Sequence, residues 1–279
     1  MLSLHTNNAA LSAQNSIGRT QGNLSTSMTR LSTGFRINSA SDDAAGLQIA
    51  TRLKAQTSGM AVAMRNTQNA TSMIQTAGGA LSEVKNMLIR MKDLATQSAD
   101  GSSSTADRTA LASEFTNLQA EIANVIENTT FGGTKLLKVG EGFGDTNKVK
   151  LQIGATTAEQ MTIDVSTDVA AIGTGAAGAT LDVSTQAKAN IAIDAVQTVI
   201  DTVSKVDSAL GGAANRLSHV NNNLSNISSN TQAAIGRIMD TDFATESANM
   251  TKNQMLTQAG TAMLKQSNQM SQMVMSLLQ

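Results

Sequence analysis

Few residues of this chain are of the types that carry chemistry, and their spacing does not build a reactive site. The two histidines, His5 and His219, each lack a second ligand-type residue at metal-binding spacing. Cysteine is absent, which excludes disulfides and thiolate nucleophiles. We therefore expect both histidines to be exposed helix residues, and we predict no metal site, no cofactor and no catalytic residue.

Two further motifs have a structural interpretation. Ser41 precedes Asp42 and Asp43, and this order is typical of a helix start, where a hydroxyl caps the first turn and the helix dipole favours negative charge. Metal binding by the acidic pair is the less favoured alternative. The glycine-rich run at 140–144 neither follows a strand nor opens a helix, as a phosphate-binding loop requires. It is interpreted as the lead-in to a hairpin.

Charge and composition narrow the classes of partner. The formal net charge is -1, and aromatic residues make up 2% of the 279 residues. Nucleic-acid binding is disfavoured, because no basic block contacts phosphates and almost no aromatic side chain stacks on bases. No segment approaches the ~20 apolar residues that span a bilayer, and the N-terminus does not resemble a secretory signal. Composition alone therefore favours a cytoplasmic protein, with neither nucleic acid nor membrane as a partner.

One long helix dominates the elements that would position any site. Apolar residues alternate at spacings of three and four for about six heptads, with one threonine among them. A repeat near 3.5 keeps one narrow face turned toward a partner, so this helix must pack against others. The seam consists of Val196, Val199, Val203, Val206, Leu210, Ala213, Leu217, Val220, Leu224, Ile227, Thr231, Ala234 and Ile238.

Three shorter patterns precede this helix. The first helix carries apolar residues from Leu4 to Phe35 and is expected to end at Gly34 in the left-handed conformation. The second, capped at Ser41, extends to a break at residues 100–103. A third starts at a motif like a capping box, formed by Ser104 and Asp107, and stops before residue 131.

The hydrophobic period then changes from helical to alternating. Apolar and polar residues alternate from Val149 to Ile153 and again from Met161 to Val165, which predicts a β-hairpin at about 149–165. The Gly/Ala-rich stretch at 170–180 is interpreted as a loop or short insert, within about residues 166–185.

A last helix follows a break at residues 239–242. Its seam again has spacings of three and four, and a glycine and a serine weaken it. We expect a coiled coil between this helix and the first one, with Leu4, Leu11, Leu24 and Leu31 on one side. On the other side stand Leu256, Gly260, Met263, Ser267, Met270, Val274 and Leu277.

These elements predict a mainly α fold, a long antiparallel helical bundle with one β-hairpin. The breaks near residues 40 and 240 mirror each other, so the chain is expected to fold back into a rod with its termini together. Residues 1–40 and 244–279 would form an inner coiled-coil domain. Residues 41–243 would form a second domain, containing the hairpin and the insert.

The two ends of the chain carry a family resemblance. Residues 31–46, from Leu31 to Gly46, closely resemble the N-terminal signature of bacterial flagellins. Residues 239–246 and the terminal run 258–279 resemble the C-terminal one. The resemblance covers about residues 1–165 and 186–279. Most flagellins insert large variable outer domains between these parts, whereas about 20 residues remain here, which implies a short form.

The resemblance implies a structural, non-enzymatic function. Flagellins polymerise into the extracellular filament that drives swimming, after export in an unfolded state through the flagellar channel and assembly at the filament tip. Terminal segments that fold only on joining the filament would place the coiled-coil seam between subunits. The implied partners are other copies of the chain, an export chaperone that binds residues 244–279, and the filament cap and hook-junction proteins.

Two alternatives stay open at this point. A hook–filament junction protein has flagellin-like ends, but the full signature at residues 38–46 and the short middle favour flagellin. A chemoreceptor-like signalling hairpin is also a long antiparallel bundle rich in Ala, Ser and Gln. It would lack the 149–165 hairpin and would need a membrane anchor.

The resemblance also implies recognition by the flagellin-sensing Toll-like receptor of animals. Residues matching the family's contact surface are Leu88, Arg90, Leu94, Gln97 and Glu114. Arg90 stands at the anchoring arginine and Glu114 at its supporting acid. Ile89 departs from the polar side chain that receptor-activating members carry. Subunit packing alone is the alternative role for this arginine and this glutamate.

Overall fold

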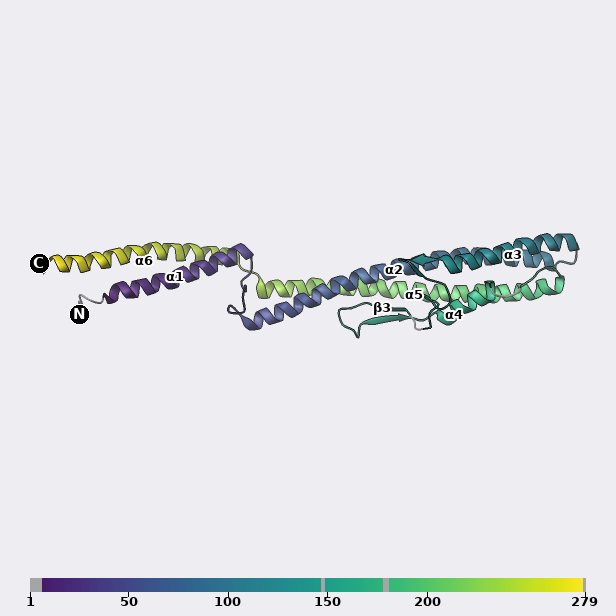
Figure 1. Ribbon diagram of the computed structural model, residues 1–279, viewed down its shortest axis with the longest axis horizontal. Helices are drawn as coiled ribbons and strands as arrows, with labels where there is room; N and C mark the ends of the chain where they lie inside the picture. The colour runs from purple at the N-terminus through teal and green to yellow at the C-terminus, as the bar shows by residue number, and fades with distance from the viewer. Residues whose placement is uncertain (1–6, 147–148, 178–180, 278–279) are drawn as a thin grey trace. The chain divides into compact units, whose positions relative to one another are not determined.

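The computed structural model describes residues 7–146, 149–177 and 181–277, and it divides into two compact units. Unit 1 combines residues up to Thr57 with those from Ser229 onward, and unit 2 extends from Ser58 to Ser228. The architecture is mainly α, as predicted, and Figure 1 shows its long helices. The domain division predicted from the sequence, at residues 40 and 243, lies at the helix breaks and not at these unit boundaries. It stays a prediction.

Three helices supply most of the core of unit 2: α2 (Ala44–Ala99), α3 (Thr105–Asn128) and α5 (Gln186–Met239). The predicted α5 seam is confirmed from Val196 to Leu217, where its large aliphatic members are buried, whereas the predicted member Ile227 is exposed. Leu81, Leu88 and Met91 of α2 lie in the same cluster, as does Phe115 of α3. Burying such side chains contributes roughly 1.5–3 kcal/mol each, so this unit has a substantial apolar core.

The helix starts follow local side-chain chemistry. The capping box of α3 is confirmed: Ser104 accepts a hydrogen bond from the Asp107 backbone N–H, and the Asp107 carboxylate accepts one from Ser104. The prediction for α2 was wrong by two residues. Asp43, not Ser41, accepts from a first-turn N–H, that of Gly46 at 2.8 Å. An aspartate caps a helix as well as a serine does, so three neighbouring caps compete at this position.

The β-structure is small. The predicted hairpin is confirmed as β3 (Val149–Gln152) paired antiparallel with β4 (Gln160–Ile163), in a register that sets Val149 opposite Ile163. A second pair, β1 (Thr130–Phe131) with β2 (Thr134–Lys135), was not predicted. Two-residue strands are too short to give an alternating pattern.

The interpretation of residues 170–180 as a loop was wrong for its described part. Helix α4 (Ser166–Ile172) continues into a π-helical turn, η1 (Gly173–Ala177). Val169, Ile172 and Ala176 are buried in the core of unit 2, at spacings of three and four. Small residues allow this turn to lie close to its neighbours. Residues 178–180 lie outside the described part.

Unit 1 is built on α1 (Asn8–Thr33) and α6 (Phe243–Leu277), which lie side by side (Figure 1). Gly34 ends α1 in the left-handed conformation at a φ of 75°, as predicted, and its N–H donates to the Arg30 carbonyl. Helix α6 begins after the predicted break, where Asp242 accepts hydrogen bonds from the Ala244 N–H and the Thr245 hydroxyl. Across the described residues, no helix is long and apolar enough to span a membrane.

Candidate functional site

The contact between α1 and α6 combines small and polar side chains with a few half-buried aliphatic ones. Three contacts fix an antiparallel register: Asn7 donates to the Ser267 carbonyl at 3.3 Å, Ile17 lies against Gly260, and Arg30 faces Glu246. A Cβ at residue 260 would lie 2.7 Å from Ile17 Cγ1, so glycine permits the close approach. The half-buried positions of α6 are Met250, Asn253, Thr257, Gly260, Leu264 and Ser267, at spacings of three and four.

Most large apolar residues of α6 lie on a different face, although Met250 and Leu264 are half-buried on the contact face. We call Met255, Leu256, Met263, Met270 and Met273 the outward stripe, because all five are exposed, with Met263 at 68%. Leu256 and Met263 each precede a half-buried contact position by one residue, which turns them about 100° away from α1. One chain therefore leaves uncovered the residues that a coiled coil would bury.

The predicted seam residues thus separate into groups. Leu24 and Leu31 of α1 are half-buried, whereas Leu11 is exposed, like the outward stripe. Gly260 and Ser267 contact α1. Leu4 lies outside the described residues. Val274 and Leu277 belong to α6, but their side chains lie outside the described part. The contact face through Thr257 was missed, because its polar and small residues give no hydrophobic signal.

The turn between α1 and α2 is tied to the end of α5 within unit 1. Arg36 N–H donates to the Met239 carbonyl at 2.6 Å, and Thr241 N–H donates to the Gly34 carbonyl at 3.0 Å. The Arg36 guanidinium also donates to the Ile238 carbonyl at 2.7 Å. Both family-like runs, near residues 36 and 240, therefore meet in one backbone-paired junction.

Asp42 holds the same turn. Its carboxylate accepts hydrogen bonds from the backbone N–H groups of Ser39 and Asn38, at 2.9 and 3.0 Å. These two donors lower the pKa of Asp42, with that of Ser39 contributing most. The acidic pair at 42–43 is therefore accounted for as one turn-forming acid and one helix cap. Among the described residues, no cluster of three or more His, Cys, Asp or Glu could hold a metal ion.

Arg90 and Glu114 form an ion pair on the surface of unit 2. Arg90 Nη2 lies 2.7 Å and Nε 2.9 Å from Glu114 Oε1, and both side chains are about half exposed. Gln97 is also exposed. Leu88 and Leu94 are buried, at 0% and 1% exposure, because their face of α2 packs into the core. In this fold those two leucines offer a partner no contact surface, whereas the other three residues do.

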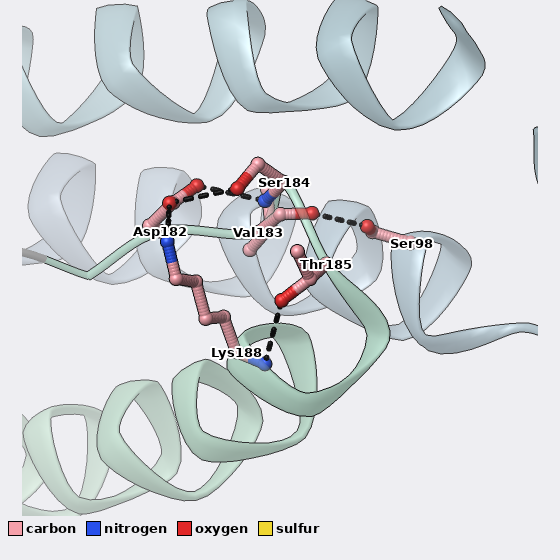
Figure 2. Close-up of polar contacts among 6 residues, drawn as sticks. All are labelled: Ser98, Asp182, Val183, Ser184, Thr185 and Lys188. Atoms are coloured by element: carbon pink, nitrogen blue, oxygen red, sulfur yellow. Dashed lines mark hydrogen bonds and ion pairs between the residues drawn. The ribbon is translucent and has the colours of Figure 1, made fainter. Parts of the chain in front are cut away.

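A polar cluster holds the segment before α5 (Figure 2). Asp182 accepts from the Ser184 N–H at 2.7 Å and from the Lys188 ammonium at 2.7 Å. Lys188 is the largest cause that lowers the pKa of Asp182 to about 2. Ser98 of α2 donates to the Val183 carbonyl at 2.5 Å. Every one of these polar groups serves local structure, and His219 is exposed as predicted.

These features define a class: a mainly α protein whose last helix carries an uncovered apolar stripe and whose polar groups cap helices and hold turns. Comparison with known proteins specifies it further. Residues 4–140 match the bacterial flagellin N-terminal helical region, and residues 193–278 match the C-terminal helical region. Flagellin of Halalkalibacterium halodurans is 41% identical over 271 residues, covering 96% of this chain and 97% of that one. The chain belongs to the bacterial flagellins.

Further similarities agree with this assignment. Flagellin of Bacillus subtilis is 36% identical over 301 aligned positions, covering 97% of this chain and 99% of that one. The crystal structure of Bacillus cereus flagellin superposes with a TM-score of 0.50 at 29% identity, covering 57% of this chain and 88% of that one.

A structure of a putative flagellar hook-associated protein from Vibrio parahaemolyticus gives a TM-score of 0.56 at 17% identity, covering 71% of this chain and 100% of that one. It shows a shared fold without favouring the junction-protein alternative. The chain is a structural subunit of the extracellular bacterial flagellar filament, and the chemoreceptor alternative is set aside.

Proposed function

We propose that the outward stripe of α6, together with Leu11 of α1, is a surface through which one subunit binds the next in the filament. The observation that carries this proposal is the row of exposed Leu256, Met263 and Met270, which recurs every seven residues. That spacing matches a coiled-coil seam. Large contiguous apolar surface on a single soluble chain marks an interaction site.

The thin contact between α1 and α6 supports the same proposal. Gly260, Thr257 and Ser267 bury little apolar area, and isolated helices are marginal in water without packing of an apolar face. The pair therefore gains most of its stability when the stripe is covered. We infer that α1 and α6 form fully only as a subunit joins the tip of the filament.

The stripe is tested by substituting Met263→Gln and Leu256→Gln together. Glutamine keeps helix propensity but puts a polar amide at each site. We expect seeded polymerisation to be lost while the helix content and melting of unit 2 stay unchanged. Lys265→Gln, an exposed change on another face of α6, is the control that should polymerise normally. Normal filaments from the double variant would overturn the proposal.

We also propose that the chain is exported unfolded and that residues 244–279 bind a helical export chaperone first. The support is the methionine content of this segment, because flexible thioether side chains suit adaptable grooves. Binding of the chaperone to a chain that lacks residues 244–279, with undiminished affinity, would contradict this. The filament cap and hook-junction proteins are proposed as further partners on the strength of family membership. A purely structural, non-enzymatic role is proposed on the same ground.

A second proposed interaction is with the flagellin-sensing Toll-like receptor. The observation that favours it is the exposed Arg90–Glu114 pair, because a half-exposed arginine can add contacts to a partner with its remaining donors. Gln97 extends this polar surface. The inward-facing Leu88 and Leu94 would then support the surface as core residues.

Arg90→Ala tests the receptor proposal in the monomer. We expect receptor activation to fall at least about ten-fold, equivalent to about 1.4 kcal/mol, with helix content unchanged. An exposed ion pair contributes little to stability, so the fold should tolerate the change. An unaltered dose–response would leave subunit packing as the role of this pair.

A further inference from the structure

Methionine is distributed unevenly between the surface of α6 and the core of unit 2. Met255, Met263 and Met270 lie on the outward stripe with more than half of each side chain exposed. Met91 and Met161 are buried, at 0% and 2% exposure. The chain has 15 methionines and no cysteine, so thioethers are its only sulfur groups. Their exposure sets which ones an oxidant reaches first.

We propose that the outward stripe is a site of methionine oxidation by peroxide, and that oxidation there blocks polymerisation of the soluble subunit. The inference rests on the proposed function, because it requires the stripe to be the surface that subunits bury. It applies to the chain before assembly, when the stripe is uncovered. Once the stripe is buried between subunits, the same sulfurs are protected.

The chemistry is a two-electron oxygen transfer. A lone pair of the thioether sulfur attacks one oxygen of hydrogen peroxide, an S–O bond forms, and the O–O bond breaks. With one proton transfer the other oxygen leaves as water. The sulfur is oxidised by two electrons to the sulfoxide, and the peroxide is reduced by the same two electrons. No metal or nucleophile of the chain takes part.

The consequence follows from the location of the sulfurs. A sulfoxide is polar and chiral, and it disrupts methionine-rich interfaces. On the outward stripe, Met263 and Met270 are neighbours one heptad apart, so two sulfoxides would stand in the same coiled-coil seam. Oxidation would leave the centre of the unit 2 core intact, because Met91 and Met161 are buried there. Assembly is therefore lost while the fold is kept.

The first measurement is a peptide map of the full-length soluble chain after treatment with hydrogen peroxide. We expect Met263, Met270 and Met255 to oxidise at least about ten-fold faster than Met91 and Met161. In polymerised chain the same three residues should oxidise at least about ten-fold more slowly than in the monomer. Equal rates for Met263 in monomer and filament would overturn the inference, because the stripe would then not be covered on assembly.

The second measurement is seeded polymerisation of the oxidised monomer. We expect its critical concentration to rise about ten-fold or more. The quadruple variant Met255→Leu, Met263→Leu, Met270→Leu and Met273→Leu removes every methionine of the outward stripe and should keep its polymerisation after peroxide, since leucine preserves volume and apolarity. The matched control, Met60→Leu, Met91→Leu and Met161→Leu, changes three buried methionines and should stay peroxide-sensitive.

The outcomes separate this inference from the proposed function. Full polymerisation of a monomer whose stripe is oxidised would overturn the inference. Subunit contacts in the filament would then be made by residues around the oxidised methionines. Loss of polymerisation in the peroxide-treated quadruple variant would also overturn it, because residues outside the stripe would then carry the effect. Failure of untreated chain to polymerise on seeds would overturn the proposed function and this inference with it.

Discussion

The helix pair of unit 1 and the core of unit 2 both contain apolar residues at spacings of three and four, but these residues are placed differently in the two units. In α5 the residues at spacings of three and four are large and buried, as Val203 and Leu210 show. In α6 most inward positions are small or polar, such as Gly260 and Ser267, and the large residue Met263 is exposed. A heptad repeat therefore reports that a helix has a partner. It does not report whether that partner lies in the same chain.

The difference predicts where each unit obtains its stability. The core of unit 2 buries large aliphatic side chains within one subunit and is self-sufficient. The pair of unit 1 buries little and exposes a stripe, so its stability is linked to subunit concentration. A filament subunit needs both properties, because it must stay soluble before assembly and bind tightly afterwards.

The largest expected effect comes from removing the outward stripe of α6. Deletion of residues 256–279 removes nearly all of the outward stripe, so we expect complete loss of seeded polymerisation. The melting of unit 2 should be unchanged, because none of its described core residues belongs to the deleted segment. Electron microscopy and calorimetry of the same sample measure the two effects. Filaments from the truncated chain would show that α6 is not an assembly element.

A paired substitution of leucines sharpens the comparison. Leu88→Ala leaves a cavity in the core of unit 2, and we expect the free energy of unfolding to fall by about 3 kcal/mol. Leu256→Ala should change monomer stability by less than about 0.5 kcal/mol, because this leucine is half exposed. Denaturant unfolding followed by circular dichroism gives both values. Similar losses from both substitutions would mean that the stripe already stabilises the single chain.

Much of the fold could be predicted from the sequence, because long helices repeat their signal many times. The α5 seam, the cap at Ser104 and the left-handed Gly34 follow from local rules that do not depend on the rest of the chain. The cap of α2 was placed two residues early, because Ser41 and Asp43 satisfy the same rule and only geometry selects between them.

The face of a helix was harder to predict than its existence. Leu256 and Gly260 seemed to share one seam, but the structure separates them between two faces. The hydrophobic repeat marks residues that one chain leaves exposed, whereas the contact within the chain relies mostly on small size and close approach. Likewise Leu94 lies one turn from Arg90 in the same sequence motif, yet Leu94 is buried in the core while the Arg90 side chain is about half exposed. Family resemblance shows which positions of two chains correspond, but it does not show which way a side chain points.

Helix caps provide a smaller effect that separates the two units. Ser104→Ala removes the capping box of α3, and we expect unit 2 to lose about 1 kcal/mol. Asp242→Ala removes the equivalent hydrogen bonds at the start of α6. There we expect lower helix content in the monomer without a change in the unfolding midpoint of unit 2. Equal shifts of that midpoint would indicate that the units unfold together.

The smallest expected effect is acid sensitivity at the start of α5 in unit 2. The pKa of Asp182 is lowered from 3.8 to about 2, chiefly by the hydrogen bond from Lys188. Because the folded-state pKa is depressed, the charged carboxylate stabilises the fold fully above the unfolded-state value. That contribution is lost as the pH falls from about 4 to about 2. Partial exposure of the pair keeps the effect small.

Asp182→Asn should therefore weaken the fall in unit 2 stability between about pH 4 and pH 2. The Ser98–Val183 contact should change little in this variant at pH 7. Lys188→Gln tests the same ion pair from the lysine side. This substitution should raise the pKa of Asp182, measured in an NMR titration of the carboxyl group. An unchanged pKa in the Lys188 variant would assign the shift to the Ser184 donors instead. Either result concerns unit 2 alone, so polymerisation through the outward stripe at neutral pH should proceed normally in both variants.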